Sequence, residues 1–135
     1  MVLRGIQSVN ARFGFEVGDS ILRAFASNIE THLTHGDRLF RWDGPVVLAL
    51  LDRADEIEKV RMQLRRVLDV RMEETFEVEG RTALIPISAV WSAFPLMPPL
   101  VAVIKQIQAF VAGQGCPDPG PLADGRAAIA HQNEA

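Results

Sequence analysis

The 135-residue sequence is short of several residue types, and each shortage argues against a class of protein. It has one cysteine, so no disulfide can form within the chain. Acidic residues outnumber basic ones, and a formal net charge of −3 argues against the basic face of a nucleic-acid-binding protein. No apolar run reaches the ~20 residues of a membrane-spanning helix, and the N-terminus lacks the apolar core of a signal peptide. We therefore expect a cytoplasmic chain with no nucleic-acid partner and no membrane insertion.

Cysteine and histidine, which often carry chemistry, offer little here. Cys116 lies in a Gly- and Pro-rich segment with no neighbouring His or Lys to activate its thiol, which favours an incidental residue. His32 and His35 have a spacing that can hold a metal on one helix, but no Cys or third His lies nearby. We expect solvated histidines and no metal site.

Size and composition indicate one globular domain followed by a tail. The chain is 48% hydrophobic, and Gly and Pro punctuate it at intervals, as in soluble domains. Its length suffices for one core but not for two. From residue 113 onward the sequence is rich in Gly, Pro, Ala and polar residues without a sustained period. We expect a domain over residues 1–112 and a disordered tail or linker over 113–135.

Strand-like and helix-like segments alternate along the domain. Helices are expected at about 6–13, from Asp19 to about 35, at 54–70 and after Pro98-Pro99. Strands are expected at 2–4, 38–42, 46–51, 76–78 and 82–91, with Pro86 indicating a sheet edge or bulge. This alternation is typical of an α/β sandwich.

Two local signals are more specific than the general pattern. Asp43-Gly44 between apolar runs predicts a β-hairpin over about 38–51, with Phe40 or Trp42 packed against a helix. Asp19 is a suitable N-cap for the long helix that follows it.

Three stretches follow motifs of a known family. Residues 10–22 read NARFGFEVGDSIL, residues 36–44 read GDRLFRWDG, and Ser88 lies in the late strand segment FEVEGRTALIPISAVWSAFP. They resemble the N-D-x-x-G-H-x-x-G-D-x-x-L, G-D-x-x-x-R-x-G-G and S-I-G-V-A segments of GGDEF domains. The resemblance covers about residues 2–112. It implies the nucleotidyl-cyclase type of fold, a central, mostly antiparallel sheet flanked by helices, with the signature hairpin at about 38–51.

The resemblance also implies an activity and a guanine site. In the family, two GTP-loaded domains face each other and condense their substrates into cyclic di-GMP with the help of Mg²⁺. The Asn and Asp that read the guanine edge match Asn10 and Asp19. A purely structural interpretation is equally open, in which Asp19 only caps its helix and Asn10 bonds local backbone.

The catalytic positions of the family do not match. Its signature G-G-D/E-E-F falls on Asp43, Gly44, Pro45, Val46 and Val47, so Pro45 stands at the acidic metal ligand and Val46 at the next acidic residue. The metal-binding Asp and the phosphate-contacting Lys of the first strand fall on Val2 and Gln7. Asp43 is expected to be a turn residue, because one carboxylate without a partner is a poor Mg²⁺ site. The resemblance thus implies a degenerate member.

Other family features are also altered. The R-x-x-D of the product-binding site falls on Thr34 to Asp37, which lacks the Arg. In the last helix Phe110 stands for a Tyr and Gly113 for a phosphate-binding Lys. The sequence opens almost inside the first strand, so we expect a truncated start or an upstream segment that completes the sheet.

The leading hypothesis is a non-catalytic GGDEF-type regulatory domain in cyclic di-GMP signalling. It would bind GTP weakly, need no cofactor, and act through sensor, receiver or phosphodiesterase domains in the same or another chain; a homodimer is compatible with it. The alternative is an active diguanylate cyclase, or a related nucleotidyl cyclase, with altered Mg²⁺ ligands. A structural module without a ligand is the third possibility.

Overall fold

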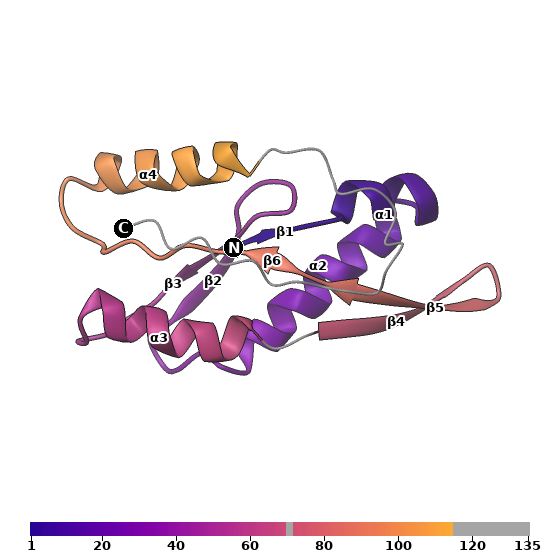
Figure 1. Ribbon diagram of the computed structural model, residues 1–135, viewed down its shortest axis with the longest axis horizontal. Helices are drawn as coiled ribbons and strands as arrows, with labels where there is room; N and C mark the ends of the chain where they lie inside the picture. The colour runs from indigo at the N-terminus through magenta and orange to yellow at the C-terminus, as the bar shows by residue number, and fades with distance from the viewer. Residues whose placement is uncertain (70–71, 115–135) are drawn as a thin grey trace.

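The computed structural model of the chain describes residues 1–69 and 72–114. Within these residues the fold is mixed α/β, with four helices and antiparallel strand pairs (Figure 1). In chain order the elements are β1 (Val2–Leu3), α1 (Ile6–Phe13), α2 (Phe15–Glu30), β2 (Arg38–Arg41), β3 (Val47–Leu50), α3 (Ile57–Leu68), β4 (Met72–Val78), β5 (Arg81–Ile87), β6 (Ala89–Val90) and α4 (Leu100–Gly113). The expected α/β architecture with antiparallel strands is therefore present.

The short first strand β1 lies between the predicted hairpin and β6. The hairpin strands β2 and β3 pair antiparallel, with Arg41 opposite Val47. The Leu3 amide donates to the Pro45 carbonyl at 2.9 Å, and an antiparallel bridge joins Val2 to Val46. On its other side Val2 pairs with Val90 of β6. The backbone pairing thus runs β2, β3, β1, β6 across the molecule.

The second hairpin, β4–β5, projects from the body of the molecule at the end opposite the start of α4 (Figure 1). Its turn residues Glu79 and Gly80 have φ values of 52° and 73°, the positive pair that type I′ turns require. Pro86 lies in β5 opposite Glu73, and β5 pairs with β4 alone among the described strands. The expectation of an edge at Pro86 is confirmed, because a proline has no N–H to give a further strand.

The core is divided between two faces of the β1, β3 and β6 strands. Successive strand residues point to opposite faces. Leu3, Val47 and Ala89 join the larger cluster, in which α1 and α2 also bury apolar side chains. Val2, Val46 and Val90 form a second cluster, against which Phe110 and Val111 of α4 pack. The two helical layers therefore cover these strands from opposite sides.

The start of the long helix differs from the expectation. α2 begins at Phe15, so Asp19 lies one turn inside it and is not its N-cap. Gly14, with φ 92° and ψ 161°, both ends α1 and occupies the N-cap of α2. A backbone conformation that only Gly adopts readily allows the chain to turn at once from one helix into the next. The capping interpretation of Asp19 is therefore wrong.

Further expectations concern the two spaced histidines, the aromatic residues of the hairpin and the tail. His32 and His35 follow the end of α2 and are exposed, so they do not share a helix. Phe40 and Trp42 are 46% and 41% exposed, and Trp42 lines a cleft together with residues of α3 and α4, so the packing of either ring against a helix stays a prediction. Cys116 and nearly all of the predicted tail lie outside the described residues. None of the helices described is long and apolar enough to cross a membrane.

Candidate functional site

The tight α1–α2 corner brings Asn10 against Gly18, the residue before Asp19. A Cβ atom placed on Gly18 would lie 1.8 Å from Oδ1 and 2.9 Å from Cγ of Asn10, so only glycine fits there. The Oδ1 atom is buried and has no hydrogen-bond partner among the described residues. The Asn10 carbonyl accepts from the Gly14 amide at 2.9 Å, but the side chain does not bond local backbone through this oxygen.

The Asp19 carboxylate is held by two arginines. Nη1 of Arg41 in β2 donates to Oδ1 at 2.5 Å, and Nη2 of Arg23, one turn further along α2, lies 3.4 Å from Oδ2. The hydrogen bond from Arg41 is the main cause that holds the pKa of Asp19 below its usual value. Because the carboxylate is about half exposed, a ligand can reach it, and it is ionised at neutral pH.

The signature hairpin turns tightly at Gly44 and Pro45. The Val46 amide donates to the Asp43 carbonyl at 3.0 Å, which closes a four-residue turn. Gly44 has φ 51°, and proline cannot follow it with a positive φ, so the turn is of the II′ kind that suits a hairpin. Asp43 is exposed at the tip. The predicted turn role of Asp43 agrees with this position.

Two positions matched to acidic residues of the family, one in its first strand and one in its signature, come together in space and are apolar. Val2 and Val46 form an antiparallel pair between β1 and the hairpin. They are 8% and 5% exposed, and with Val90 they make the second core cluster. Phe110, which packs on this cluster, also makes an edge-to-face contact with Phe94 at 6.3 Å between ring centroids. Apolar side chains therefore fill the space around Val2 and Val46 and leave little room there for water or ions.

These residues do not fit a magnesium ion. Mg²⁺ binds through carboxylates, phosphates and water, and valine side chains offer no oxygen. Across residues 1–69 and 72–114, no group of three or more His, Cys, Asp or Glu side chains is placed to hold a metal. Gln7 and Gly113, matched to the family's phosphate-contacting lysines, are both exposed and uncharged. The side chains at this point therefore offer no ligands to a metal ion.

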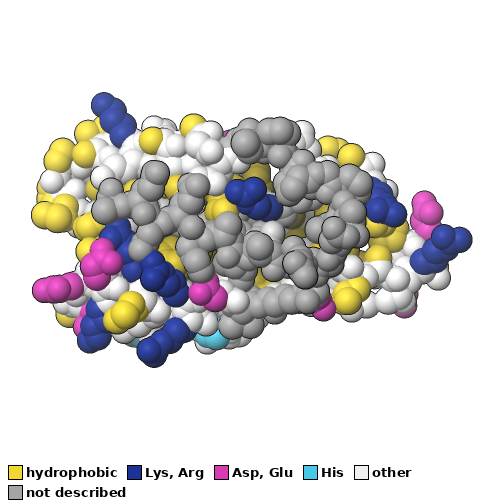
Figure 2. Space-filling model, viewed as in Figure 1, with side chains coloured by type: hydrophobic (Ala, Val, Ile, Leu, Met, Phe, Trp, Pro, Cys, Tyr) yellow, Lys and Arg dark blue, Asp and Glu magenta, His cyan; other side chains and the backbone are white. Residues whose placement is uncertain are grey.

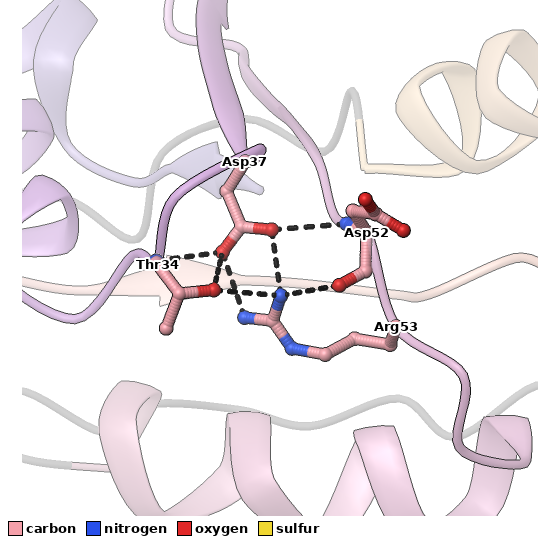
Figure 3. Close-up of polar contacts among 4 residues, drawn as sticks. All are labelled: Thr34, Asp37, Asp52 and Arg53. Atoms are coloured by element: carbon pink, nitrogen blue, oxygen red, sulfur yellow. Dashed lines mark hydrogen bonds and ion pairs between the residues drawn. The ribbon is translucent and has the colours of Figure 1, made fainter.

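The Asp37 carboxylate accepts hydrogen bonds from both segments that flank the signature hairpin, the one before β2 and the one after β3 (Figure 3). Its carboxylate accepts two hydrogen bonds from the Arg53 guanidinium, at 2.6 and 2.7 Å. It also accepts from the backbone amides of Thr34 and Asp52, at 2.8 and 2.9 Å. The Asp37 side chain is fully buried, and the Arg53 hydrogen bonds hold its pKa far below the usual range. This network ties the segment before β2 to the segment after β3.

The start of α4 forms an apolar surface patch. Figure 2 shows apolar side chains gathered at the end of the molecule where α4 begins in Figure 1. The side chains of the α4 patch are each more than half exposed; they are Leu96, Met97, Leu100 and Val101. A cleft of about 560 Å³ between β3, α3 and α4 is lined mostly by apolar residues, among them Leu96 and Leu100 of the patch and the exposed Trp42 and Leu50. These exposed apolar residues are the clearest surface for contact with another protein.

Comparison with known proteins settles the family. The model of the family described as "Diguanylate cyclase, GGDEF domain" matches residues 3–108. This chain belongs to the GGDEF domain family. The GGDEF chain is also 28% identical over 67 residues to an uncharacterized protein of Synechocystis sp., a match that covers 50% of this chain and 10% of that protein. It thus spans about a tenth of the length of that relative. No solved structure matches this GGDEF chain.

Within the GGDEF domain, the structure brings some of the predicted residues together. It places Asn10 beside the neighbour of Asp19, and it pairs Val2 with Val46. Sequence reasoning missed the partner of Asp37, because nothing in the sequence around Arg53 distinguishes it from other surface arginines. It also gave Arg41 no role, although this Arg belongs to the motif G-D-x-x-x-R.

Proposed function

We propose that this GGDEF domain does not synthesise cyclic di-GMP and serves as a regulatory domain in cyclic di-GMP signalling that binds a guanine nucleotide weakly. The observation that carries the proposal is the buried pair of Val2 and Val46, at positions matched to the metal-binding Asp of the family's first strand and to the second acidic residue of its signature. With Val90 and the α4 residues above them, these valines form part of the folded core. Rebuilding a metal site there would require a carboxylate in an apolar cluster, which is costly without a partner.

The guanine half of the proposal depends on Asn10 and Asp19. A carboxylate can accept both donors of the guanine edge, and an amide can both donate and accept. In this domain the two side chains lie on one helical corner, with Asn10 against the residue that precedes Asp19. Among the residues matched to phosphate contacts, neither Gln7 nor Gly113 carries a charge. Binding is therefore expected through the base, with little contribution from phosphates or Mg²⁺.

The catalytic half is tested by measuring cyclic di-GMP from GTP with Mg²⁺ or Mn²⁺. We expect no product above a no-protein control, because no side chain at residues 2, 45 and 46 supplies an oxygen ligand. A second sample at high protein concentration allows for the pairing of two domains that the reaction needs. Metal-dependent product in either sample would contradict the proposal and support a diguanylate cyclase with altered metal ligands.

The binding half is tested by titrating GTP, GDP and ATP, each with and without Mg²⁺. We expect the two guanine nucleotides to bind with dissociation constants on the order of 0.1–1 mM, as befits recognition without charge-assisted phosphate bonds. Asn10→Ala should remove this binding. Asn28→Ala is the matched control, because Asn28 is exposed near the end of α2, away from the α1–α2 corner. Equal affinity for ATP and GTP, or unchanged binding by Asn10→Ala, would exclude the guanine site.

The partners in this proposal are sensor, receiver or phosphodiesterase domains, in the same or another chain. The α4 patch supports it, because exposed apolar side chains that gather on one surface often mark protein contacts. A phosphodiesterase domain for cyclic di-GMP can be assayed with and without this domain. A change in its rate that Leu100→Ser abolishes, and that Leu84→Ser in β5 leaves intact, is the expected result. The absence of any change would count against that partner.

A further inference from the structure

A single ion pair joins the base-reading helix to the signature hairpin. Arg41 is the last residue of β2, directly before Trp42 and the turn. Its Nη1 atom donates to Oδ1 of Asp19 at 2.5 Å, across 22 positions of the sequence. The pair therefore connects the two motif stretches, residues 10–22 and 36–44. No role for Arg41 follows from its place in the motif.

The geometry of the contact leaves the carboxylate available to a base. Arg41 uses one nitrogen and one oxygen, so the pair is not the two-bonded fork that occupies both carboxylate oxygens. Arg23 lies at 3.4 Å from the other oxygen, and its side chain is 68% exposed. Each carboxylate oxygen has two acceptor sites, so Asp19 can accept from Arg41 and from the donors of a guanine edge together.

We infer that Arg41 is a positioning residue for guanine recognition, which orients the Asp19 carboxylate toward the base without touching the base itself. The inference rests on the proposed guanine site and adds to it a residue that acts through Asp19. A carboxylate on a half-exposed helix surface has several rotamers, and a short charge-assisted hydrogen bond selects one of them. Because Arg41 extends from β2, a shift of the signature hairpin would also move the Asp19 carboxylate at the guanine site.

Three elements surround Asp19, and two of them, β2 and α2, present a charged side chain to it. Arg41 reaches it from β2 and Arg23 from α2 itself, whereas α1 presents the neutral amide of Asn10 to the adjoining Gly18. Both arginines favour the ionised carboxylate, and Arg41 contributes most. Removing Arg41 should therefore move the acid limit of base binding upward in pH, toward the value of an ordinary aspartate.

The test uses guanosine, which has the base but no phosphate, with wild-type protein and three variants. Arg41→Gln should weaken guanosine binding by about two- to five-fold, the scale expected of an exposed ion pair. Arg41→Lys should recover part of this loss because it keeps the charge. Arg38→Gln is the matched control: it removes the same charge from the same strand, but its side chain points to the opposite face. In Arg41→Gln the loss of binding on acidification should begin at higher pH than in wild type.

The possible outcomes separate this inference from the proposed function. Absence of guanosine binding by the wild type would overturn the guanine site and the inference with it. If the wild type binds, tighter guanosine binding by Arg41→Gln would show that Arg41 competes with the base. Weaker GTP binding with unchanged guanosine binding would assign Arg41 to the phosphates. Either of these results, or an equal loss in Arg38→Gln, would overturn the inference alone.

Discussion

The close approach of Asn10 to Gly18 predicts that Gly18→Ala destabilises the wild-type domain but stabilises an Asn10→Ala variant. Gly18→Ala adds a Cβ atom that would lie 1.8 Å from Oδ1 of Asn10. Gly18 is buried, so the helix cannot shift outward without moving its core contacts. The amide of Asn10 must therefore leave its place. In an Asn10→Ala background the two atoms that clash are absent.

The magnitudes follow from two opposing effects. Within a helix, alanine is more stable than glycine by roughly 0.5–1 kcal/mol. Overpacking at a buried contact costs about 1–3 kcal/mol, and the short Asn10 side chain can absorb part of this by rotating. Gly18→Ala should therefore destabilise the wild type by about 1–2 kcal/mol. In the Asn10→Ala background only the helix gain remains, so Gly18→Ala should stabilise by about 0.5–1 kcal/mol.

Urea unfolding of the four proteins in this double-mutant cycle measures both effects. The midpoints should move in opposite directions in the two backgrounds while the dependence on urea stays constant. Gly113→Ala is the control, because a Cβ atom there meets nothing within 4 Å. An effect of the same sign in both backgrounds would refute the packing argument. Gly18→Ala should also abolish guanine binding, since it displaces the amide that is to read the base.

Two further changes probe parts of the fold away from the guanine site. Asp37→Asn should destabilise the protein by about 2–3 kcal/mol at neutral pH, because it leaves Arg53 without its buried partner. The stabilisation by ionised Asp37 is complete above the pKa of an unfolded aspartate, about 4, and is lost as the pH falls below that value. Unfolding curves of Asp37→Asn should therefore lack this acid dependence. Asp55→Asn, at an exposed pair, should cost under about 0.5 kcal/mol. Glu79→Asn should stabilise by about 1 kcal/mol in thermal unfolding, because Glu79 has φ 52° and Asn-Gly80 suits a type I′ turn; unchanged stability would argue against that turn.

Features set by neighbouring residues could be predicted well from the sequence. Asp43-Gly44 between apolar runs predicted a hairpin, and the structure has β2 and β3 on either side of it. Gly14 was expected to end the first helix, and α1 ends at Phe13. In both cases a glycine at a positive φ fixes the local backbone, so a few residues contain the whole signal.

The start of α2 was mispredicted because two signals competed at the same place. Asp19 has the side chain of a good cap, and it precedes an apolar stripe. Gly14, five residues before Asp19, already supplies the non-helical residue at which a helix can begin. The periodicity of the buried residues alone does not separate these starts, because Val17 and Gly18 fit the inward face as well as Ile21 does.

Long-range contacts were accessible only where the family resemblance supplied them. The resemblance predicts that the signature hairpin lies beside the N-terminal strand, and the structure pairs Val2 with Val46, 44 positions apart. The contact between Asp37 and Arg53 follows from neither local pattern nor motif. An arginine becomes the partner of a buried carboxylate only when the loops on both sides of a hairpin are in place, and no spacing rule encodes that.

The residues that match the family's motifs differ in whether the fold alone explains them. Asp37 is fully used by Arg53 and backbone amides, so its place in the motif needs no ligand. Asp19 has Arg41 as a partner, but this contact is half exposed and contributes little to the fold. Asn10 differs from both, because its buried Oδ1 has no partner among the described residues, and an unpaired buried polar atom costs about 1–3 kcal/mol. An apolar residue at that position would therefore make the fold more stable. If Asn10 had a structural role, Asn10→Ala would destabilise the domain. If Asn10 binds guanine, Asn10→Ala should leave the domain at least as stable while it loses guanine binding.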